Sequence, residues 1–336
     1  MLIIFEKIIF EKKALWKANY MKNAQGIGYG KAILFGEHFV VYGLPGIVSA
    51  IDLNTTCTFK KNPKGVKGII SNDLVTGEKI VYGRAPYKNL DKVIKVILEK
   101  TGIKEDDFTL ELKTNMSLKG GMGSSAALCV SITKCLNEQF KLNLTLEQVN
   151  KIAYEAEKVF HATPSGIDNT ASTYGGLLWF MKKDNKTQIE KIQIKKSIEA
   201  ILADTGIMRD TGEVVKMVKE QKEKNKEKYK TIFEKYEKIA KQAKQSIEEE
   251  NWERVCELMQ ENQELLRKIG VSSQENEKLI SIALASGAKA AKITGAGLGG
   301  NIIAITPGKE LQEKVAKAFQ KKGYKAYKIK IGKMKK

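Results

Sequence analysis

The sequence predicts a mixed fold of helices and strands that is large enough for two domains. Its 336 residues exceed the usual size of one domain. Short apolar runs and alternating apolar and polar residues dominate residues 26–115, between Gly, Pro and Asn signals that are typical of strand ends. Over residues 211–269 apolar side chains recur every three or four positions, which is typical of helices packed on one side. The composition changes near Lys195, and we expect a domain boundary there.

Composition excludes some classes of protein. The formal charge of +19 would suit nucleic acid, an anionic membrane or an anionic substrate, and would also arise in any lysine-rich proteome. The basic residues are scattered among glutamates without an RNA-binding or zinc-binding spacing, so we expect no nucleic acid partner. No apolar run approaches the roughly 20 residues of a membrane span. The four cysteines form no CxxC pair, and no signal peptide is evident, so we expect a cytoplasmic protein with buried thiols.

Residues 1–23 do not resemble the rest of the chain. Their apolar residues would form a stripe with lysines opposite, as in an interfacial helix. We favour an appended or wrongly assigned start instead, because Met21 lies just before the first organised segment.

The first organised segment reads GIGYGKAILFGEHFVVYG. We expect two strands, Ala32–Phe35 and Phe39–Tyr42, interrupted by Gly36-Glu37-His38. A charged residue between buried strands needs a partner, and a ligand is one candidate. Lys31, at the start of the first strand, could face a phosphate. Each residue also has a structural alternative: a surface lysine, a salt-bridged glutamate, or a histidine at the edge of the core.

The same patterns predict the remaining elements. Strands are expected within Ile51–Tyr82 and over Phe108–Leu112, Gly176–Phe180, Ile189–Ile194, Ala200–Ala203, Ala290–Ile293 and Asn301–Ile305. Helices are expected over Leu90–Glu99, Ala126–Phe140, Leu146–Phe160 and within Thr211–Ile269, followed by a helix and a strand within Glu310–Ile331. The helix at Leu146 should begin with a capping box formed by Thr145 and Gln148.

A glycine-rich segment, NMSLKGGMGSSAA (Asn115–Ala127), lies between an expected strand and an expected helix. Glycines let backbone N–H groups approach a phosphate closely, and the start of a helix adds partial positive charge. Ser124 and Ser125 could cap that helix or offer a hydroxyl to Mg²⁺. The segment is equally compatible with a glycine turn followed by a serine cap.

Two carboxylates flank a sharp turn further along the chain. Glu157 lies in the last turn of an expected helix. Asp168, eleven positions after Glu157, follows the turn Pro164-Ser165-Gly166. This arrangement can bring both into one crevice. One could hold Mg²⁺ while the other takes or orients a hydroxyl proton.

A second glycine-rich segment, TGAGLGG (Thr294–Gly300), matches G-x-G-x-x-G. The residues after it resemble a strand rather than a helix, and no suitable acid follows about 20 residues on, so a dinucleotide site is disfavoured. A glycine turn lining a ligand crevice fits better. The chain contains no Walker A pattern.

Three separated segments, GKAILFGEHFVVYG, GGMGSSAA and KITGAGLGG, resemble in order and spacing the three motifs of the GHMP small-molecule kinases. The segment HATPSGIDNTASTYGG narrows the resemblance to the mevalonate kinases within that superfamily. The resemblance implies an α+β fold of two lobes, one like the second domain of ribosomal protein S5 and one ferredoxin-like. It suggests domains over 24–195 and 196–336, with mevalonate and ATP bound between them.

The resemblance also implies a role for individual residues. Asp168 would accept the proton of the attacking hydroxyl, Lys31 would favour the alkoxide, and Mg²⁺ would be held by Ser125 and Glu157. The residues expected to bind ATP are Lys119, Gly120, Gly121, Met122, Gly123, Ser124 and Ser125. Those expected near the substrate are Glu37, His38, Tyr174, Thr205, Gly295 and Ala296.

Some residues depart from the usual family pattern, namely Ser117, Lys119, Leu298 and Asn301. They concern nucleotide affinity and preference more than the reaction. Alternatives are phosphomevalonate kinase, a sugar kinase, a decarboxylase of the same superfamily, and a non-catalytic nucleotide-binding protein. The last two are disfavoured because Lys31 and Asp168 are both present. A symmetric homodimer is the default expectation for the oligomer.

Overall fold

The structure is a computed structural model that describes residues 24–66, 68–73, 79–81, 88–105, 107–117, 121–161, 164–183 and 186–332. The predicted extension 1–23, Lys119 and Gly120 lie outside the described residues. The strands are β1 (Gln25–Phe35), β2 (Gly46–Lys61), β3 (Gly68–Asp73), β4 (Lys79–Val81), β5 (Phe108–Thr114), β6 (Leu177–Lys183), β7 (Lys186–Ile192), β8 (Ile198–Asp204), β9 (Ala290–Thr294), β10 (Asn301–Ile305) and β11 (Lys325–Ile331). The helices are the short 3-10 helix η1 (Val40–Tyr42), α2 (Lys88–Thr101), α3 (Ser124–Phe140), α4 (Leu146–Glu157), α5 (Ile167–Tyr174), α6 (Thr211–Lys224), α7 (Lys226–Glu248), α8 (Trp252–Lys268), α9 (Gln274–Ala285) and α10 (Lys309–Lys321).

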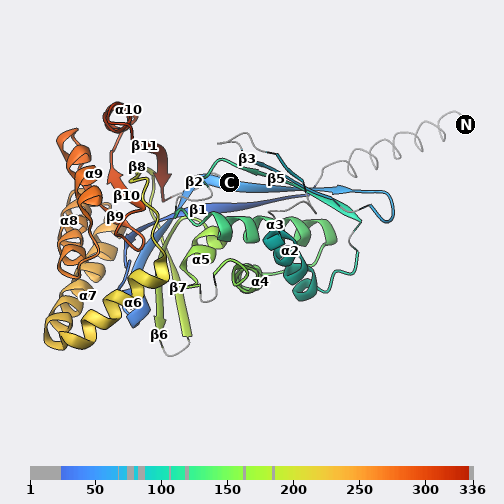
Figure 1. The fold of residues 1–336 in the computed structure, drawn as a ribbon, viewed down its shortest axis with the longest axis horizontal. Coiled ribbons are helices and arrows are strands. Elements are labelled where there is room, and N and C mark those ends of the chain that lie inside the picture. The colour runs from blue at the N-terminus through green and yellow to red at the C-terminus, as the bar shows by residue number, and fades with distance from the viewer. Residues whose placement is uncertain are drawn as a thin grey trace, which may run out of the picture.

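The N-terminal part is a mostly antiparallel sheet covered by helices. The long strand β2 pairs with β1, β5 and β6, while β3 runs parallel to β5 and pairs with β4 on its other side. Helices α2, α3 and α4 share a buried apolar cluster with β2 and β5. In Figure 1 these helices lie together on one side of the long strands.

Helix α3 lies directly against the backbone of β1 because two glycines make room for it. A Cβ at Gly26 would lie 2.0 Å from the carbonyl oxygen of Ser131, and a Cβ at Gly28 would lie 2.0 Å from that of Ala127. Any side chain there would displace the helix. The glycines of β1 therefore fix the start of α3 beside the strand.

The C-terminal part has the strand–helix order of a ferredoxin-like lobe. Its four strands are arranged β11-β8-β10-β9, all antiparallel. Alternate residues of the central strands point to opposite faces. Ile201 and Ile302 pack against α9 and α10, whereas Leu202 and Ile303 face the cluster that contains α7 and α8.

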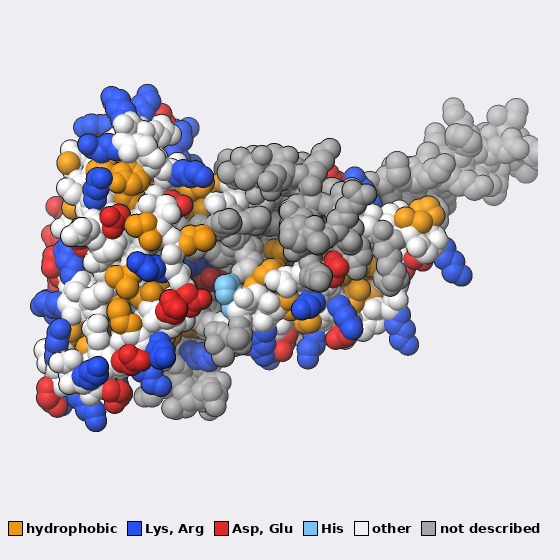
Figure 2. Space-filling model, in the orientation of Figure 1, with side chains coloured by type: hydrophobic (Ala, Val, Ile, Leu, Met, Phe, Trp, Pro, Cys, Tyr) orange, Lys and Arg blue, Asp and Glu red, His pale blue; other side chains and the backbone are white. Residues whose placement is uncertain are grey.

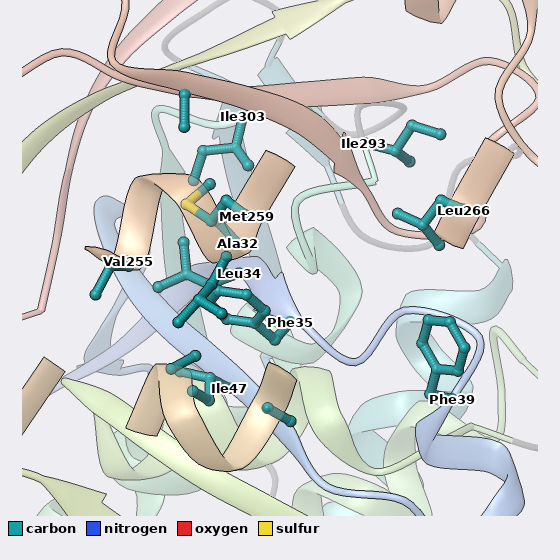
Figure 3. Packing of buried hydrophobic residues seen from close by; sticks show 14 of the residues in the cluster. Ala32, Leu34, Phe35, Phe39, Ile47, Val255, Met259, Leu266, Ile293 and Ile303 are labelled. Atoms are coloured by element: carbon teal, nitrogen blue, oxygen red, sulfur yellow. The ribbon is translucent and has the colours of Figure 1, made fainter. Parts of the chain in front are cut away.

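One buried cluster continues from the first part into the second. Figure 3 shows Leu34 and Phe35 of β1 beside Ile47 of β2, with Met259 of α8 and Ile303 of β10 above them. The two sheets also meet where Ile331 of β11 pairs with Ile51 of β2. The predicted domain boundary at 195/196 falls between β7 and β8 and stays a prediction.

Most predicted elements are present, with one clear exception. The prediction of a strand over Phe39–Tyr42 is wrong, because Val40–Tyr42 forms the 3-10 helix η1. Gly36 and Gly43 have positive φ values of 128° and 79°, which bend the backbone on both sides. Phe39 stacks on Tyr236 with ring centroids 3.8 Å apart, so tertiary packing determines this segment.

Other expectations are confirmed. Thr145 and Gln148 form the capping box that starts α4, and all four cysteines are buried and unpaired in disulfides. The predicted charged helical stretch consists of α6, α7 and α8, and the buried face of α7 includes Tyr236 and Ile247. None of the helices among the described residues is long and apolar enough to cross a membrane. On the face in Figure 2, basic side chains are interleaved with acidic ones.

Candidate active site

Lys31 and Asp168 form an ion pair at the centre of the candidate site. Lys31 is on β1 with 6% of its side chain exposed, and its Nζ lies 3.3 Å from Oδ1 of Asp168. Asp168 lies in the first turn of α5, two residues after Gly166, whose φ is 87°. About a third of its side chain is exposed, 32%. The carboxylate is therefore the accessible member of the pair, and the cation is held behind it.

Glu157, at the end of α4, is the second carboxylate of the site. It is almost wholly buried. Burial, and then the negative charge of Asp168, raise the pKa of Glu157 to about 8, against the opposing effects of Lys31 and a hydrogen bond with Ser125. Its Oε2 atom has no hydrogen-bond partner among the described residues. The structure thus brings together the two carboxylates that the sequence suggested would meet.

The glycine loop before α3 lies against the same pair. A Cβ at Gly123 would lie 3.1 Å from Cγ of Lys31 and 3.5 Å from Cβ of Asp168. The backbone N–H of Lys31 donates to the carbonyl of Met122 over 2.8 Å, which ties the loop to β1. Gly121 and Gly123 have φ values of 61° and 75°. The loop therefore needs glycine at both positions.

The start of α3 has the features of an anion site. Gly123 occupies its N-cap position and no side-chain cap is formed there. A helix that begins without a side-chain cap presents N–H groups and partial positive charge at its first turn. Ser124 and Ser125 are its first two residues. This geometry suits a phosphate beside Lys31 and Asp168.

Glu37 and His38 lie where β1 leads into η1. The side chain of Glu37 is fully buried and pairs with Lys292, and its Oε2 accepts a hydrogen bond of 3.2 Å from Asn262. The predicted contact of Glu37 with a substrate stays a prediction, although both of its oxygens are engaged within the protein. Nε2 of His38 lies 2.7 Å from the carbonyl oxygen of Ala296.

The third glycine segment forms a turn between β9 and β10, as predicted. The amide of Asn276 clamps it, because its Nδ2 donates to the carbonyl of Gly299 and its Oδ1 accepts from the N–H of Gly299. Thr205 lies beside the turn, with its N–H 3.0 Å from the carbonyl oxygen of Gly300. Gly295 and Ala296 belong to the same turn. The structure therefore groups Thr205 and Ala296 with His38.

Tyr174 is not grouped with the other predicted residues. Asp168 is in the first turn of α5, whereas Tyr174 is its last residue, about 9 Å further along the helix axis at 1.5 Å per residue. Burial and then the charge of Glu147 raise the pKa of Tyr174, which places it near the start of α4. Glu157 lies at the opposite end of that helix. The predicted substrate role of Tyr174 remains untested.

Sequence reasoning missed the polar residues behind the site. Lys292 is wholly buried in β9, and Asn262 and Asn276 are buried in α8 and α9. Lys292 gave a usable signal, because a lysine within the apolar run of a strand needs a partner. Asn262 gave none, since its partner Glu37 is distant in the sequence, and Asn276 gave only the local signal of a capping box with Ser273.

Comparisons with known proteins identify related kinases. Residues 88–176 match the model of the GHMP kinases N terminal domain, and residues 243–325 match that of the GHMP kinases C terminal domain. A mevalonate kinase of Pyrococcus abyssi is 33% identical over 309 residues, covering 86% of this chain and 90% of that protein. A mevalonate kinase of Arabidopsis thaliana is 27% identical over 90% of this chain and 96% of its own length.

Solved structures give the same result. The crystal structure of L. major mevalonate kinase in complex with R-mevalonate matches with a TM-score of 0.84 and 30% identity, over 93% of this chain and 96% of that one. The Methanococcus jannaschii mevalonate kinase, 24% identical with a TM-score of 0.78, shares the fold. From the extent of these matches and the two kinase domain models, the chain belongs to the mevalonate kinase family of the GHMP kinases.

Proposed function

We propose that this enzyme transfers the γ-phosphoryl group of ATP to the primary hydroxyl of mevalonate, giving 5-phosphomevalonate and ADP in isoprenoid synthesis. The observation that carries the proposal is the ion pair of Lys31 and Asp168 at 3.3 Å, beside the glycine loop at the start of α3. Family membership names the substrate class, and the pair supplies the groups that the reaction needs.

In the proposed reaction Asp168 accepts the proton of the primary hydroxyl as its oxygen attacks the γ-phosphorus. The bond from that phosphorus to the bridging oxygen of ADP breaks, and ADP leaves. Lys31 stabilises the negative charge that develops on the attacking oxygen and on the transferred group. The N–H groups from Gly121 to Ser125 hold the phosphates in line, and phosphoryl transfer depends mainly on such positioning.

The residues around Glu157 fit a Mg²⁺ ion. A buried carboxylate whose pKa is raised to about 8, and whose Oε2 has no partner among the described residues, would gain from a nearby cation. Carboxylate and hydroxyl oxygens, here from Glu157 and Ser125, suit Mg²⁺. The described residues hold no cluster of three or more acidic, histidine or cysteine side chains for a metal, so ATP oxygens would complete the site. When bound, Mg²⁺ would neutralise phosphate charge.

Two broader features of the prediction remain proposals. A cytoplasmic location is supported by the four buried cysteines, none of which forms a disulfide, as is usual in a reducing compartment. A homodimer is supported only by the general prevalence of symmetric dimers.

The experiment is an assay of ADP release with Mg²⁺-ATP and four acceptors: mevalonate, 5-phosphomevalonate, galactose and homoserine. We expect turnover with mevalonate alone. Turnover with 5-phosphomevalonate instead would keep the fold and the chemistry but contradict the substrate. If folded protein shows no turnover with any acceptor, the result would contradict the proposed kinase activity and favour a non-catalytic nucleotide-binding protein.

The same assay tests the proposed metal residues. In Glu157→Gln the Mg²⁺ concentration needed for half-maximal rate should rise by about tenfold or more, because an anionic ligand is lost. Glu155→Gln is the matched control, since Glu155 is in the same helix turn but pairs with Lys158 at the surface. Equal Mg²⁺ requirements in the two variants would contradict the assignment of Glu157.

A further inference from the structure

A buried ion pair joins two segments that are far apart in the sequence. Lys292 of β9 and Glu37, 255 residues away, pair with side chains that are both 0% exposed. Nζ of Lys292 also donates to the carbonyl of Ile293 over 2.6 Å. Nδ2 of Asn262, on α8, donates to the other carboxylate oxygen of Glu37 over 3.2 Å. Both oxygens of the carboxylate are therefore satisfied by residues of the C-terminal half.

Buried charges of this kind rarely add stability. Removing two charges from water costs several kcal/mol per ion, and apolar residues of similar volume often fill such a site as well or better. The pair is therefore better explained by the positions that it fixes than by added stability. Those positions belong to the residues that follow Glu37 and Lys292 in the chain, which include His38 and Thr294.

Two further contacts join the same segments. The N–H of Ile33 donates to Oγ1 of Thr294 over 2.8 Å, and His38 meets the carbonyl oxygen of Ala296 at 2.7 Å. With the pair of Glu37 and Lys292 between them, these contacts join residues 33–38 to residues 292–296 at three points. Lys31 is two residues before Ile33 on β1. The contacts therefore lie directly beside the reactive pair.

The contact of His38 fixes the state of its ring. A carbonyl oxygen only accepts, so Nε2 of His38 must carry the proton. Burial lowers the pKa of His38, which keeps the ring neutral near pH 7 and leaves Nδ1 as an acceptor. Nδ1 is buried and has no partner among the described residues. The orientation of the His38 ring depends on the positions of the adjacent Glu37 and of the carbonyl of Ala296.

We propose that Lys292 and Asn262 are positioning residues, which act through Glu37 to hold His38 and the Thr294–Gly300 turn in one arrangement on the acceptor side of the crevice. This inference rests on the proposed function, which supplies the acceptor alcohol and the expected place of His38 and Ala296 beside it. The Gly121–Ser125 loop is held on β1 by the hydrogen bond from Lys31 to Met122, and the nearest atom to a Cβ at Gly121 is Nδ2 of Asn301 at 4.0 Å. Disturbing the network should therefore affect the acceptor far more than ATP.

The chemistry of the network predicts the effect of removing its cation. Among the described residues, the charge of Glu37 acts on the pKa of Lys292, of His38 and of Tyr236 of α7. Burial and then the charge of Glu37 raise the pKa of Tyr236 well above its usual value, and its hydroxyl already donates to Pro45. Tyr236 and neutral His38 supply no positive charge. Without Lys292, the buried carboxylate of Glu37 is left without its counter-charge, so it is expected to move, and this movement releases His38.

The first test compares the kinetics of Lys292→Met with those of the wild-type enzyme. The KM for mevalonate should rise by about tenfold while the KM for ATP stays within about twofold, since only the acceptor side is disturbed. Lys289→Met is the control, because Lys289 is exposed just before β9.

The second test reads the ring of His38 without any substrate. The chain contains only two histidines, and His161→Gln assigns the two imidazoles in a long-range ¹H–¹⁵N spectrum. Wild-type His38 should show a single tautomer with the proton on Nε2 between pH 6 and 8. In Lys292→Met the spectrum of His38 should instead show exchange between the two neutral tautomers. This readout stays valid even if the wild-type enzyme fails to phosphorylate mevalonate, which would contradict the proposed function alone.

Asn262→Ala keeps the test decisive if Lys292→Met does not fold, because it removes one hydrogen bond and no charge. Its acceptor KM should rise by about threefold, with a weaker form of the same change at His38. Unchanged acceptor KM values and an unchanged His38 spectrum in a folded variant would overturn the inference. So would equal changes in the KM for ATP and for mevalonate.

Discussion

Lys31 and Asp168 show how the reactivity of single residues depends on burial. The ammonium group is nearly buried behind the carboxylate, which keeps about a third of its surface accessible. The more accessible carboxylate can reach a bound hydroxyl, while the nearly buried cation acts at short range on the charge that develops there. This division of roles follows from geometry, because either group on the surface would be screened.

Asp168→Asn tests this division. The amide keeps the shape of the side chain but cannot accept the proton, so kcat should fall by about a thousandfold. The KM for ATP should change little, because the glycine loop is intact. Steady-state kinetics with mevalonate measure both values, and Asp107→Asn, remote on the N-terminal sheet, is the control. A kcat within about threefold of wild type would show that Asp168 is not the proton acceptor.

Lys134 offers a test of buried charge away from the reactive pair. It lies on α3, and its Nζ donates to the carbonyl of Thr173 in α5 over 2.9 Å. Burial, and then the charge of Lys191, lower the pKa of Lys134 to about 8. Between that value and the ordinary 10.5, the unfolded chain binds more protons than the folded protein, so stability rises with pH.

Relative to Lys134→Met, the wild-type free energy of unfolding should therefore rise by up to about 3 kcal/mol between pH 8 and pH 10.5. Urea denaturation at several pH values measures this difference. Lys95→Met removes an exposed lysine and should run parallel to wild type. Parallel curves for Lys134→Met and wild type would mean that Lys134 is protonated normally in the folded protein.

At the scale of elements, the site depends on how closely α3 approaches β1. The contact at Gly28 fixes the start of the helix, and with it the loop that we propose for the ATP phosphates. Here the glycine is required by packing, since its φ is not in the positive range. Gly102 is the opposite case, with a φ of 73° and open space around its Cα.

Gly28→Ala should cost about 3 kcal/mol of stability and raise the KM for ATP, because the new methyl overlaps the Ala127 carbonyl. Gly102→Ala should cost about 1 kcal/mol through backbone strain alone, without a kinetic effect. Denaturant unfolding and ATP titration distinguish the two variants. Equal stability losses would show that α3 can move away from β1 without cost.

Elements with a strong periodic pattern could be predicted from the sequence, and elements shaped by distant contacts could not. The stripe of α7 and the capping box of α4 are local signals, and both are confirmed. The segment Phe39–Tyr42 resembles a strand locally but forms a 3-10 turn, because Phe39 stacks on Tyr236 of α7. That partner is almost 200 residues away in the sequence.

The candidate site shows the same limit. Glycine loops and the spacing of Glu157 and Asp168 are visible in the sequence, because each group lies near its own turn. The partners of Glu37 are not, because Lys292 and Asn262 come from β9 and α8. Tyr174 shares a segment with Asp168, but the helix carries it to the other end of α5. Proximity in the sequence therefore did not predict proximity of Tyr174 to Asp168 in the structure.

At the scale of the whole molecule, one apolar core crosses the predicted domain boundary. Phe35 and Ile47 from the first part pack in the same cluster as Met259 and Ile293 from the second. Neither part can unfold without exposing apolar surface of the other. The two lobes are therefore expected to behave as one cooperative unit.

Differential scanning calorimetry should accordingly give one transition, with the calorimetric enthalpy close to the van't Hoff enthalpy. Ile47→Ala should lower that single midpoint without splitting it, because its neighbours belong to both parts. Two separate transitions in the wild-type protein would show that the lobes are independent, and that the boundary near residue 195 divides two folding units.

Identifying the product tests the proposed phosphorylation of mevalonate most directly. The enzyme should be incubated with ATP, Mg²⁺ and ¹³C-labelled mevalonate, and the mixture followed by ³¹P and ¹³C NMR. We predict a phosphate monoester at C5, formed in a one-to-one ratio with ADP, and formed about a thousandfold more slowly with Asp168→Asn. A phosphate ester at C3, or ADP released with inorganic phosphate and unchanged mevalonate, would contradict the account.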